Sequence, residues 1–435
     1  MVSTACLSLA PDPALPWRDA LLDEAAIRTT LAALDPGGRA RVSDCSIARV
    51  NYQVGKSLRA VFQITIDDEP HTVAVRMFRQ GRSAAAYARA CEGARPLGNL
   101  SPVMHAPELE SVFWVFPNDR KIDTLVPLIE APVPAFLDRS AKGSRARLVA
   151  YAPEKSATLA YTDEHGRTVA YAKVTAACEA ERDYTTYEHL RAGLSQTDPW
   201  LRLPCPLAYS IEYRTLWLEA MHGRRLADPT DSSTGSAHMD LDDLRRFGSA
   251  VAAFHGLSAP GAPRFDRFSP ARLMGEATLI ARVRPDVAEA CGAVARRLAA
   301  AAPPEGLDVV CLHGDLHPKN AIVCRDRLAL IDVEDVAIGP AAADIGCFLA
   351  TLLYLRTVQR LSRAAFVEQA CAFLRGYVEV RPLPAAESIT WHAAAALVVE
   401  RAARAVFRIR PPGLAHLAAL FREADWVLDH GLELS

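Results

Sequence analysis

The sequence lacks the features that would mark a membrane or secreted protein. It contains no uninterrupted apolar run of the ~18 residues that a membrane-spanning helix needs. Its first residues, MVSTACLSLAPDPALPW, have no basic stretch before a short apolar run, which argues against a secretory signal. The ten cysteines include no Cys-x-x-Cys pair, a pattern typical of reduced thiols rather than of disulfides or a zinc site. Together these absences predict a cytoplasmic protein without membrane contact.

A strong charge of either sign is also missing. The formal net charge of the 435 residues is -2, which gives no electrostatic reason to expect nucleic acid as a partner. Half of the residues are hydrophobic and 23% are charged, as in ordinary globular proteins. The length is too great for one small core and predicts two or three structural units.

One late stretch concentrates polar groups between short apolar runs. Its loop HGDLHPKN follows a run that is typical of a buried strand and precedes two β segments joined by a four-residue turn. We expect these three strands at 309–312, 321–323 and 328–331. The arrangement places Asp315, Asn320 and Asp332 at adjacent strand ends. Phosphoryl transfer uses such a set, because a carboxylate orients the attacking hydroxyl and oxygen ligands hold Mg²⁺ on the nucleotide phosphates.

This stretch resembles the catalytic loop of the aminoglycoside phosphotransferase and choline kinase family. That loop reads roughly HGDxxxxN and is followed by an ID(W/L)E-type segment, and this chain has HGDLHPKN followed by IDVED. The resemblance extends over residues 145–430. It implies an α+β, bilobal protein-kinase-like fold, with a small antiparallel-sheet N-lobe and a mainly helical C-lobe. It also implies ATP as the phosphate donor, with GTP not excluded, Mg²⁺ as the metal, and a small-molecule alcohol as the acceptor.

The resemblance assigns roles within the loop. Asp315 would be the catalytic base, or the group that orients the hydroxyl, while Asn320 and Asp332 would bind Mg²⁺. His313 would anchor the loop through hydrogen bonds. Asp344 would cap the following helix and bind the loop backbone. Two further loop residues, His317 and Lys319, either touch the phosphate or substrate or are solvated.

Lys173 is the expected phosphate-binding lysine of the N-lobe. It ends the strand TVAYAKV and precedes Asp315 by 142 residues, a separation similar to that of the family. In such enzymes a lysine on the third strand contacts the α- and β-phosphates. The next helix should supply its acidic partner, and three residues remain open for that role: Glu181, Asp183 and Glu188.

The expected loop over the phosphates departs from the family because PEKSA contains no glycine. Glycine there allows backbone N–H groups to approach phosphate oxygens. We expect Lys155 and Ser156 to contact phosphate directly instead. Farther along, LEAM at 218–221 resembles the family's hinge. The backbone of Glu219 and Met221 would bind the adenine edge there.

Residues 1–140 form an extra N-terminal α/β part, ahead of an N-lobe at 145–222 and a C-lobe at 223–435. We expect a helix over 18–35, strands at 57–66, 71–78 and 112–116, and a helix at 83–93. Lys56-Ser57 corresponds to Lys155-Ser156, and Arg76 stands where the N-lobe has Lys173. This pattern has two possible explanations. One is a diverged duplication of a single sheet, and the other is a pair of unrelated sheets with similar hairpins. Without the lysine, the extra part is expected to cap the kinase core or to form a homodimer surface.

The C-lobe is expected to be helical, and one of its helices carries a row of arginines. Arg401, Arg404 and Arg408 share a face, with Arg410 nearby. Three interpretations remain open: a solvated face, binding of an anionic acceptor, or contact with the N-terminal part. The expected helices cover 240–255, 286–301, 344–357, 362–378, 385–408 and 413–430.

Two functions follow from these patterns. The first is ATP-dependent phosphorylation of a small-molecule hydroxyl, on a sugar, an amino alcohol or a related metabolite. The alternative is a nucleotide-binding regulatory pseudo-kinase with little catalysis, which the glycine-free loop and the repeated sheet would suit. A protein kinase is disfavoured because no APE-like end of an activation segment follows IDVED. The C-lobe also has no dense acidic cluster of the kind that a polycationic aminoglycoside needs.

Overall fold

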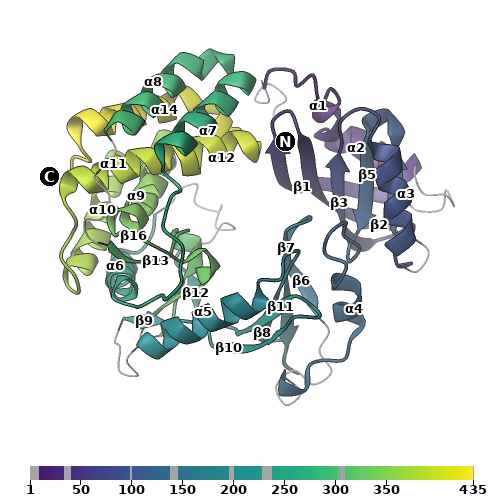
Figure 1. Ribbon diagram of the computed structural model, residues 1–435, viewed down its shortest axis with the longest axis horizontal. Helices are drawn as coiled ribbons and strands as arrows, with labels where there is room; N and C mark the ends of the chain where they lie inside the picture. The colour runs from purple at the N-terminus through teal and green to yellow at the C-terminus, as the bar shows by residue number, and fades with distance from the viewer. Residues whose placement is uncertain are drawn as a thin grey trace.

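The computed structural model describes residues 9–33, 41–97, 100–137, 146–194, 200–227, 238–301, 303, 309–325 and 327–434. It shows a mixed α+β chain with two five-stranded sheets followed by a helical part. In Figure 1 the first sheet is purple to blue, the second is teal, and the helical part runs from green to yellow. The expected boundary between residues 140 and 145 lies outside the described residues, so the three-part division stays a prediction.

The N-terminal helix is two helices rather than the single one expected over 18–35. They are α1 (Arg18–Leu21) and α2 (Glu24–Ala33). The break has a local cause. The side chain of Asp23 accepts hydrogen bonds from the N–H groups of Ala25 at 3.0 Å and Ala26 at 3.1 Å, which is a helix N-cap.

The first sheet contains two strands that the sequence pattern did not reveal, β1 and β4. Its second and third strands are joined by a tight hairpin in which Asp67 and Asp68 form the turn, at φ 50° and 67°. These angles are those of a two-residue hairpin turn. The elements are β1 (Val42–Gln53), β2 (Ser57–Ile66), β3 (Glu69–Met77), α3 (Ser83–Gly93), β4 (Val103–Ala106) and β5 (Ser111–Val115).

The second sheet follows after the short helix α4 (Leu125–Glu130) and contains the expected strand TVAYAKV. Its helix crosses between the third and fourth strands. The elements are β6 (Arg147–Ala152), β7 (Ser156–Thr162), β8 (Thr168–Thr175), α5 (Ala180–Gly193), β10 (Pro206–Ser210) and β11 (Thr215–Glu219).

The two sheets have the same connectivity. Their strand orders are β1-β2-β3-β5-β4 and β6-β7-β8-β11-β10, and in each a helix follows the third strand. The register matches as well, because Arg76 pairs with Arg59 as Lys173 pairs with Thr158, each two residues into its second strand. This correspondence favours a diverged duplication over two unrelated sheets.

The helical part contains the expected helices, with three differences. Helix α7 was not expected, the helix over 385–408 includes a π-helical turn at Leu397–Ala402, and the last segment is two helices. The side chain of Asp240 caps α6 by accepting from the N–H of Asp243 at 3.0 Å. The helices are α6 (Leu241–His255), α7 (Pro270–Val283), α8 (Ala288–Ala300), α9 (Ala342–Thr357), α10 (Arg363–Val378), α11 (Ala386–Ala396), α12 (Ala403–Phe407), α13 (Pro411–Ala415) and α14 (Leu417–His430).

Two small sheets hold the HGDLHPKN loop against this helical part. Strand β13 before the loop pairs with β16, and β14 after it pairs with β15, so the loop joins two separate sheets. Strand β9 pairs in parallel with β15. The strands are β9 (Leu201–Arg202), β12 (Arg224–Arg225), β13 (Val309–Leu312), β14 (Ala321–Val323), β15 (Leu328–Leu330) and β16 (Ala337–Pro340).

Both faces of the first sheet contribute side chains to apolar clusters that extend into other parts of the protein. Val61 and Ala74 pack in one apolar cluster with second-sheet residues such as Leu159. The opposite face, with Phe62, belongs to the large cluster that extends into the helical part. Since burying one such side chain is worth about 1.5–3 kcal/mol, the first sheet is an integral part of the fold. Across the described residues, we find no helix whose length and apolar character would let it cross a membrane.

Candidate active site

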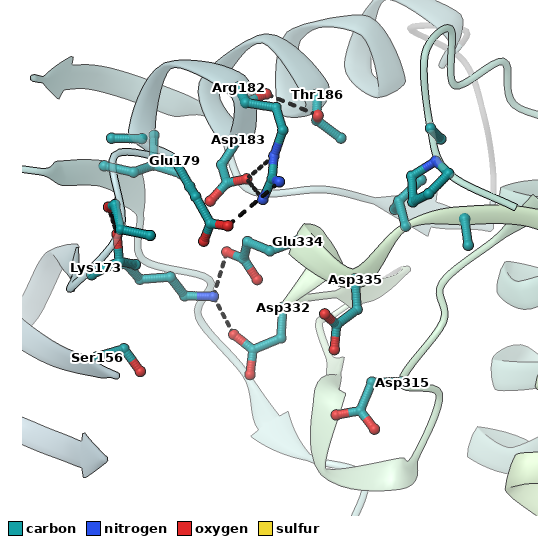
Figure 2. A pocket seen from close by; sticks show the side chains of 18 of the residues that line it. Ser156, Lys173, Glu179, Arg182, Asp183, Thr186, Asp315, Asp332, Glu334 and Asp335 are labelled. Atoms are coloured by element: carbon teal, nitrogen blue, oxygen red, sulfur yellow. Dashed lines mark hydrogen bonds and ion pairs between the residues drawn. The ribbon is translucent and has the colours of Figure 1, made fainter. Parts of the chain in front are cut away.

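A cleft of about 1210 Å³ lies between the second sheet and the helical part. Figure 2 shows Lys173 pointing from the second sheet toward Asp332 and Glu334, whose carboxylates come from a loop of the helical part. The predicted site residues that line the cleft are Lys155, Ser156, Lys173, Asp315 and Asp332.

The HGD loop is fixed by hydrogen bonds to its backbone and its histidine. The carboxylate of Asp344 accepts from the N–H of His313 at 2.6 Å and of Gly314 at 3.1 Å. The ring Nε2 of His313 lies 2.9 Å from the carbonyl oxygen of Ile331, which confirms the expected anchor. Asp344 lies inside the first turn of α9 and does not cap it, because its oxygens are taken by the loop.

Gly314 is required by this geometry for two reasons. Its φ of +79° belongs to the left-handed region that side chains disfavour. A Cβ on Gly314 would also lie 2.0 Å from the carbonyl oxygen of Asp335. Behind the loop, His255 bridges Asp344 and Tyr377, at 3.2 Å and 2.8 Å, so its role is structural.

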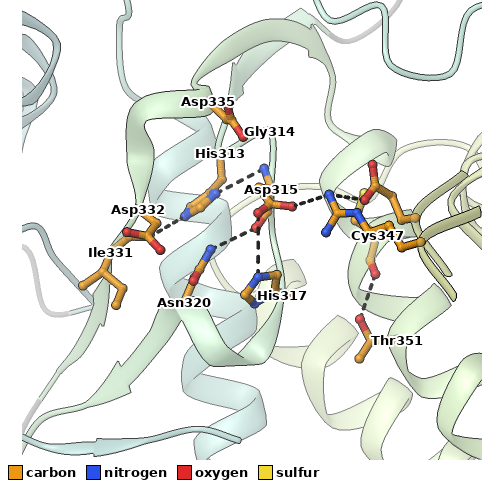
Figure 3. Close-up of polar contacts among 12 residues, drawn as sticks. His313, Gly314, Asp315, His317, Asn320, Ile331, Asp332, Asp335, Cys347 and Thr351 are labelled. Atoms are coloured by element: carbon orange, nitrogen blue, oxygen red, sulfur yellow. Dashed lines mark hydrogen bonds and ion pairs between the residues drawn. The ribbon is translucent and has the colours of Figure 1, made fainter. Parts of the chain in front are cut away.

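Asp315 lies at the floor of the cleft among positively charged groups. Its Oδ1 is 3.1 Å from a guanidinium nitrogen of Arg404 and 3.5 Å from one of Arg267, and its Oδ2 is 3.7 Å from His317 Nε2 (Figure 3). Burial alone would raise the pKa of Asp315, but Arg404, His317 and Arg267 together lower it to about 2. Asp315 is therefore ionised at neutral pH.

His317 is neutral in this environment. Burial lowers its pKa to about 4, despite the nearby Asp315 carboxylate. Its Nδ1 is buried and has no hydrogen-bond partner among the described residues. His317 therefore presents a neutral, partly buried ring to Asp315.

Asn320 and Asp332 supply the oxygen donors expected for a metal. The side-chain N–H of Asn320 donates to the carbonyl oxygen of Asp315 at 3.2 Å, which points its other end, the amide oxygen, away from the loop backbone. Asp332 has left-handed backbone angles, φ 61° and ψ 48°. Burial would raise the pKa of Asp332, but Lys173 outweighs it and lowers this pKa. An amide oxygen and an ionised carboxylate are hard donors that suit Mg²⁺ together with phosphate oxygens.

Lys173 reaches across the cleft from β8. Its acidic partners do not come from the following helix, as the sequence led us to expect. Its ammonium group forms ion pairs with Asp332 and, at 2.5 Å, with Glu334 (Figure 2). The hydroxyl of Tyr187 donates to the same Glu334 carboxylate at 3.2 Å. Burial would lower the pKa of Lys173, but Glu334, Tyr187 and Asp332 hold it well above its usual value.

None of the three acidic residues of α5 pairs with Lys173. Asp183 pairs with Arg182 at 2.9 Å, Glu181 accepts from the Tyr209 hydroxyl at 3.2 Å, and Glu188 lies beside Tyr184. The partner comes instead from the IDVED segment that follows Asp332. The sequence did show an acidic residue there, but no periodicity or spacing assigned it to Lys173.

The glycine-free loop is held by an acidic residue that sequence reasoning missed. Glu154 has a φ of 63°, a conformation uncommon for a side-chain-bearing residue. Gly55, at the equivalent position of the first sheet, has a φ of 68°. The Glu154 side chain is only 3% exposed and forms ion pairs with three arginines from outside the second sheet: Arg59, Arg76 and Arg120.

The hinge candidates do not line the cleft. The Glu219 side chain accepts from the N–H of Cys205 at 3.1 Å, and the N–H of Ala220 donates to the carbonyl oxygen of Val169 at 3.1 Å. The side chain of Met221 packs on a small apolar cluster that includes Ile322. Adenine binding by the backbone of Glu219 and Met221 stays a prediction.

Two arginines of the row are held by contacts inside the protein. Arg401 donates to Thr351 and to the carbonyl oxygen of Cys347, and Arg404 pairs with Glu400 and Asp315. The π-helical turn at Leu397–Ala402 carries Glu400 and Arg401, and such turns are frequent at functional sites. Neither this turn nor the approach of Arg267 to Asp315 had a signal in the sequence.

A comparison with protein-family models finds one match. Residues 162–383 match the model described as the phosphotransferase enzyme family, which is more than half of the chain. A search of curated protein sequences found no match.

Several solved structures are similar at low identity. A glucosamine kinase in complex with glucosamine, ADP and inorganic phosphate is 17% identical, covers 92% of this chain and 98% of its own, and gives a TM-score of 0.43. A choline/ethanolamine kinase family protein from Mesorhizobium loti is 16% identical over 67% and 93% of the chains, with a TM-score of 0.44. A choline kinase from Cryptosporidium parvum is 10% identical over 71% and 97%, with a TM-score of 0.47.

Proposed function

The chain belongs to the phosphotransferase enzyme family, and from this premise we propose that it transfers the γ-phosphate of ATP to a hydroxyl group of a small molecule. In the reaction a bond forms between the acceptor oxygen and the γ-phosphorus, and the bond from that phosphorus to the β–γ bridging oxygen breaks. ADP leaves, and the hydroxyl proton is released. The acceptor would be a sugar, an amino alcohol or a related metabolite.

Asp315 would orient the hydroxyl and receive its proton. The carboxylate is ionised because three positive or polar groups stabilise it, so it is ready to accept a hydrogen bond from the acceptor. Its low pKa makes it a weak base. This suits a loose transition state, in which the proton leaves late and positioning contributes most of the rate.

Lys173 would bind the phosphates of the nucleotide. It lies in the same cleft as Asp315 and is kept charged by Glu334 and Asp332. Lys155 and Ser156, at the edge of the cleft, would contact the phosphates from the loop side. GTP in place of ATP remains open, because these contacts do not reach a base.

Asn320 and Asp332 would hold Mg²⁺. Mg²⁺ usually takes one or two protein oxygens and completes its shell with phosphate oxygens and water. When bound, the ion would neutralise negative charge that develops on the phosphates. Asp332 is positioned for a dual role, since its carboxylate already contacts the phosphate-binding Lys173.

The observation that carries this proposal is the joint placement of Asp315, Asp332 and Lys173 in one cleft. The test is a screen of hydroxyl-bearing metabolites for acceptor-dependent ADP formation, run with the wild-type protein and with Asp315→Asn. We expect at least one acceptor to release ADP with the wild type and to fail with the variant. Nucleotide binding, measured by calorimetry, should survive in the variant.

The alternative is a nucleotide-binding regulatory pseudo-kinase. One observation favours it: the loop above the phosphates has no glycine and is tied to the first sheet through Glu154. Tight ATP binding without ADP formation for any acceptor would support this function over the first. The cytoplasmic location and a homodimer through the N-terminal part stay predictions.

A further inference from the structure

A second cavity lies where the three parts of the chain meet. It has a volume of about 540 Å³ and is lined by residues of β1, of β6 and of the segment that follows α12. Ala150 lines both this cavity and the cleft, so the two spaces adjoin.

The charged groups lining this cavity all have the same sign. They are Arg49 from β1, and Arg408 and Arg410 from the end of the arginine row; none of the described residues that line it is a carboxylate. Among the described residues, none of these three side chains has an ion pair or a side-chain hydrogen bond. Arg404 differs, since it is shared by Asp315 and Glu400. Three like charges facing one space, without a described counter-charge, form a receptor for an anion.

The electrostatics of the cluster agree with its geometry. Burial and the neighbouring Arg49, Arg404 and Arg410 lower the pKa of Arg408 to about 10. Burial together with Arg410 and Arg59 also lowers the pKa of Arg49. Charges that repel one another in a partly buried space are unfavourable, and a bound anion would remove that repulsion.

The cluster lies close in the chain to a residue that contacts Asp315. Arg404 contacts Asp315 at 3.1 Å, and Arg408 lies one helical turn farther along the same segment. One turn advances on the order of 6 Å, about the length of a small sugar or hydroxy acid. Lys319, whose pKa burial and the surrounding arginines lower, adds another positive charge on the same side.

We propose that the acceptor is an anionic alcohol, whose carboxylate or phosphate group binds Arg49, Arg408 and Arg410 while its hydroxyl lies at Asp315. This inference rests on the proposed phosphotransferase function and narrows it to one class of acceptor. It also gives the first sheet a part in the site, because Arg49 belongs to β1. The guanidinium groups would offset the repulsion between an anionic acceptor and the phosphates of ATP.

The first experiment compares matched acceptors with the full-length protein. ADP formation is measured with a neutral hexose, the corresponding uronic acid, the hexose 6-phosphate and the amino sugar. We expect the acid or the phosphate to exceed the neutral sugar in kcat/KM by at least about tenfold, with the amino sugar lowest. The ranking of acid against phosphate identifies the anionic group. Preference for the neutral or the amino sugar would overturn the inference while leaving the phosphotransferase function intact.

The second experiment uses Arg49→Gln and Arg408→Gln, with Arg375→Gln as a matched control. Arg375 is an exposed residue of α10, so the control removes the same charge away from the cavity. We expect either cavity variant to raise KM for the anionic acceptor by at least about tenfold, with KM for ATP unchanged. Unchanged acceptor KM in both variants would contradict the assignment.

A third measurement tests anion binding by the arginines without needing an acceptor that is phosphorylated. If no acceptor in the panel is phosphorylated, that result counts only against the proposed phosphotransferase function. Thermal unfolding is followed with and without inorganic sulfate, at saturating ADP so that the nucleotide site is filled. Sulfate should raise Tm more for the wild type than for Arg49→Gln/Arg408→Gln. Without sulfate the double variant should be as stable as the wild type or more so. Equal sulfate shifts, or a clear loss of stability in the double variant, would show that the arginines are structural.

Discussion

Arg76 of the first sheet forms an ion pair with Glu154 of the second sheet. At the equivalent position of the other sheet, each of them is replaced by a different residue. Arg76 stands where the second sheet has Lys173, and Glu154 stands where the first has Gly55. The pair therefore couples the repeated sheet to the loop above the cleft. The first sheet lacks the lysine of a nucleotide site, but its arginines hold the loop of the second sheet that contains Glu154.

Replacing Glu154 with Gln should destabilise the protein. Glu154 is almost fully buried, and its removal leaves Arg59, Arg76 and Arg120 without their shared counter-charge. Loss of one partner of a buried ion pair typically costs about 3–5 kcal/mol in the free energy of unfolding. Denaturant unfolding measures this change. Arg120→Gln is the comparison, and it should cost less because two arginines remain; equal stability of wild type and Glu154→Gln would refute the role.

The contribution of Glu154 should also depend on pH. Burial would raise its pKa, but Arg120, Arg76 and Arg59 outweigh burial and lower it below its usual value. The lowered pKa means that the stabilisation is complete above the ordinary glutamate pKa and is lost as pH falls through the folded-state value. Stability curves between pH 7 and pH 3 should therefore converge for wild type and Glu154→Gln at the acid end. Parallel curves would contradict this.

Removing Arg404 should shift the acid limit of activity. Burial raises the pKa of Asp315, yet Arg404, His317 and Arg267 bring it to about 2, so the wild-type carboxylate stays ionised throughout the range in which the protein is assayed. In Arg404→Gln this pKa should rise toward its ordinary value. The pH profile of kcat/KM should then show an acid-side loss that begins at higher pH than in the wild type. Identical acid limbs would show that Arg404 does not act through Asp315.

Glu334, rather than an acidic residue of α5, should control ATP binding. Glu334→Gln leaves Lys173 with Asp332 alone, so the lysine is less firmly held for the phosphates. We expect KM for ATP to rise by about tenfold, with a smaller change in KM for the acceptor. Glu181→Gln is the matched control, since the Glu181 carboxylate accepts a hydrogen bond from the Tyr209 hydroxyl rather than from Lys173. A larger effect in the control than in Glu334→Gln would restore the α5 assignment.

Removal of Mg²⁺ should abolish turnover, and Asn320→Ala should weaken the response to the metal. The amide oxygen of Asn320 is one of two protein donors in the proposed site, so its loss should raise the Mg²⁺ concentration for half-maximal rate by about 10-fold or more. Titration of Mg²⁺ at fixed ATP measures this value. Ser388→Ala, a substitution on α11 outside the proposed metal site, serves as control. Coincident titration curves for wild type and Asn320→Ala would exclude Asn320 as a ligand.

Much of the site could be predicted because its key residues follow one another in a short stretch. The strands around HGDLHPKN were readable from apolar runs, and the resemblance of this loop to a known family pointed to His313 as its anchor and to Lys173. Strand β1 could not be predicted, because its buried and exposed residues do not alternate regularly. Most of its residues are exposed or partly buried. The partners of Lys173 and Asp315 come from segments distant in sequence, and no periodicity connects Glu334 or Arg267 to them.

The most direct test of the account follows the phosphate itself. Phosphorus NMR of ATP, Mg²⁺ and an acceptor identified by the screen should show a new phosphomonoester signal with the wild-type protein. With Asp315→Asn the same signal should form at least about a hundredfold more slowly, because the group that orients the hydroxyl and takes its proton is lost. Formation of the phosphomonoester at the wild-type rate in Asp315→Asn would contradict the central claim.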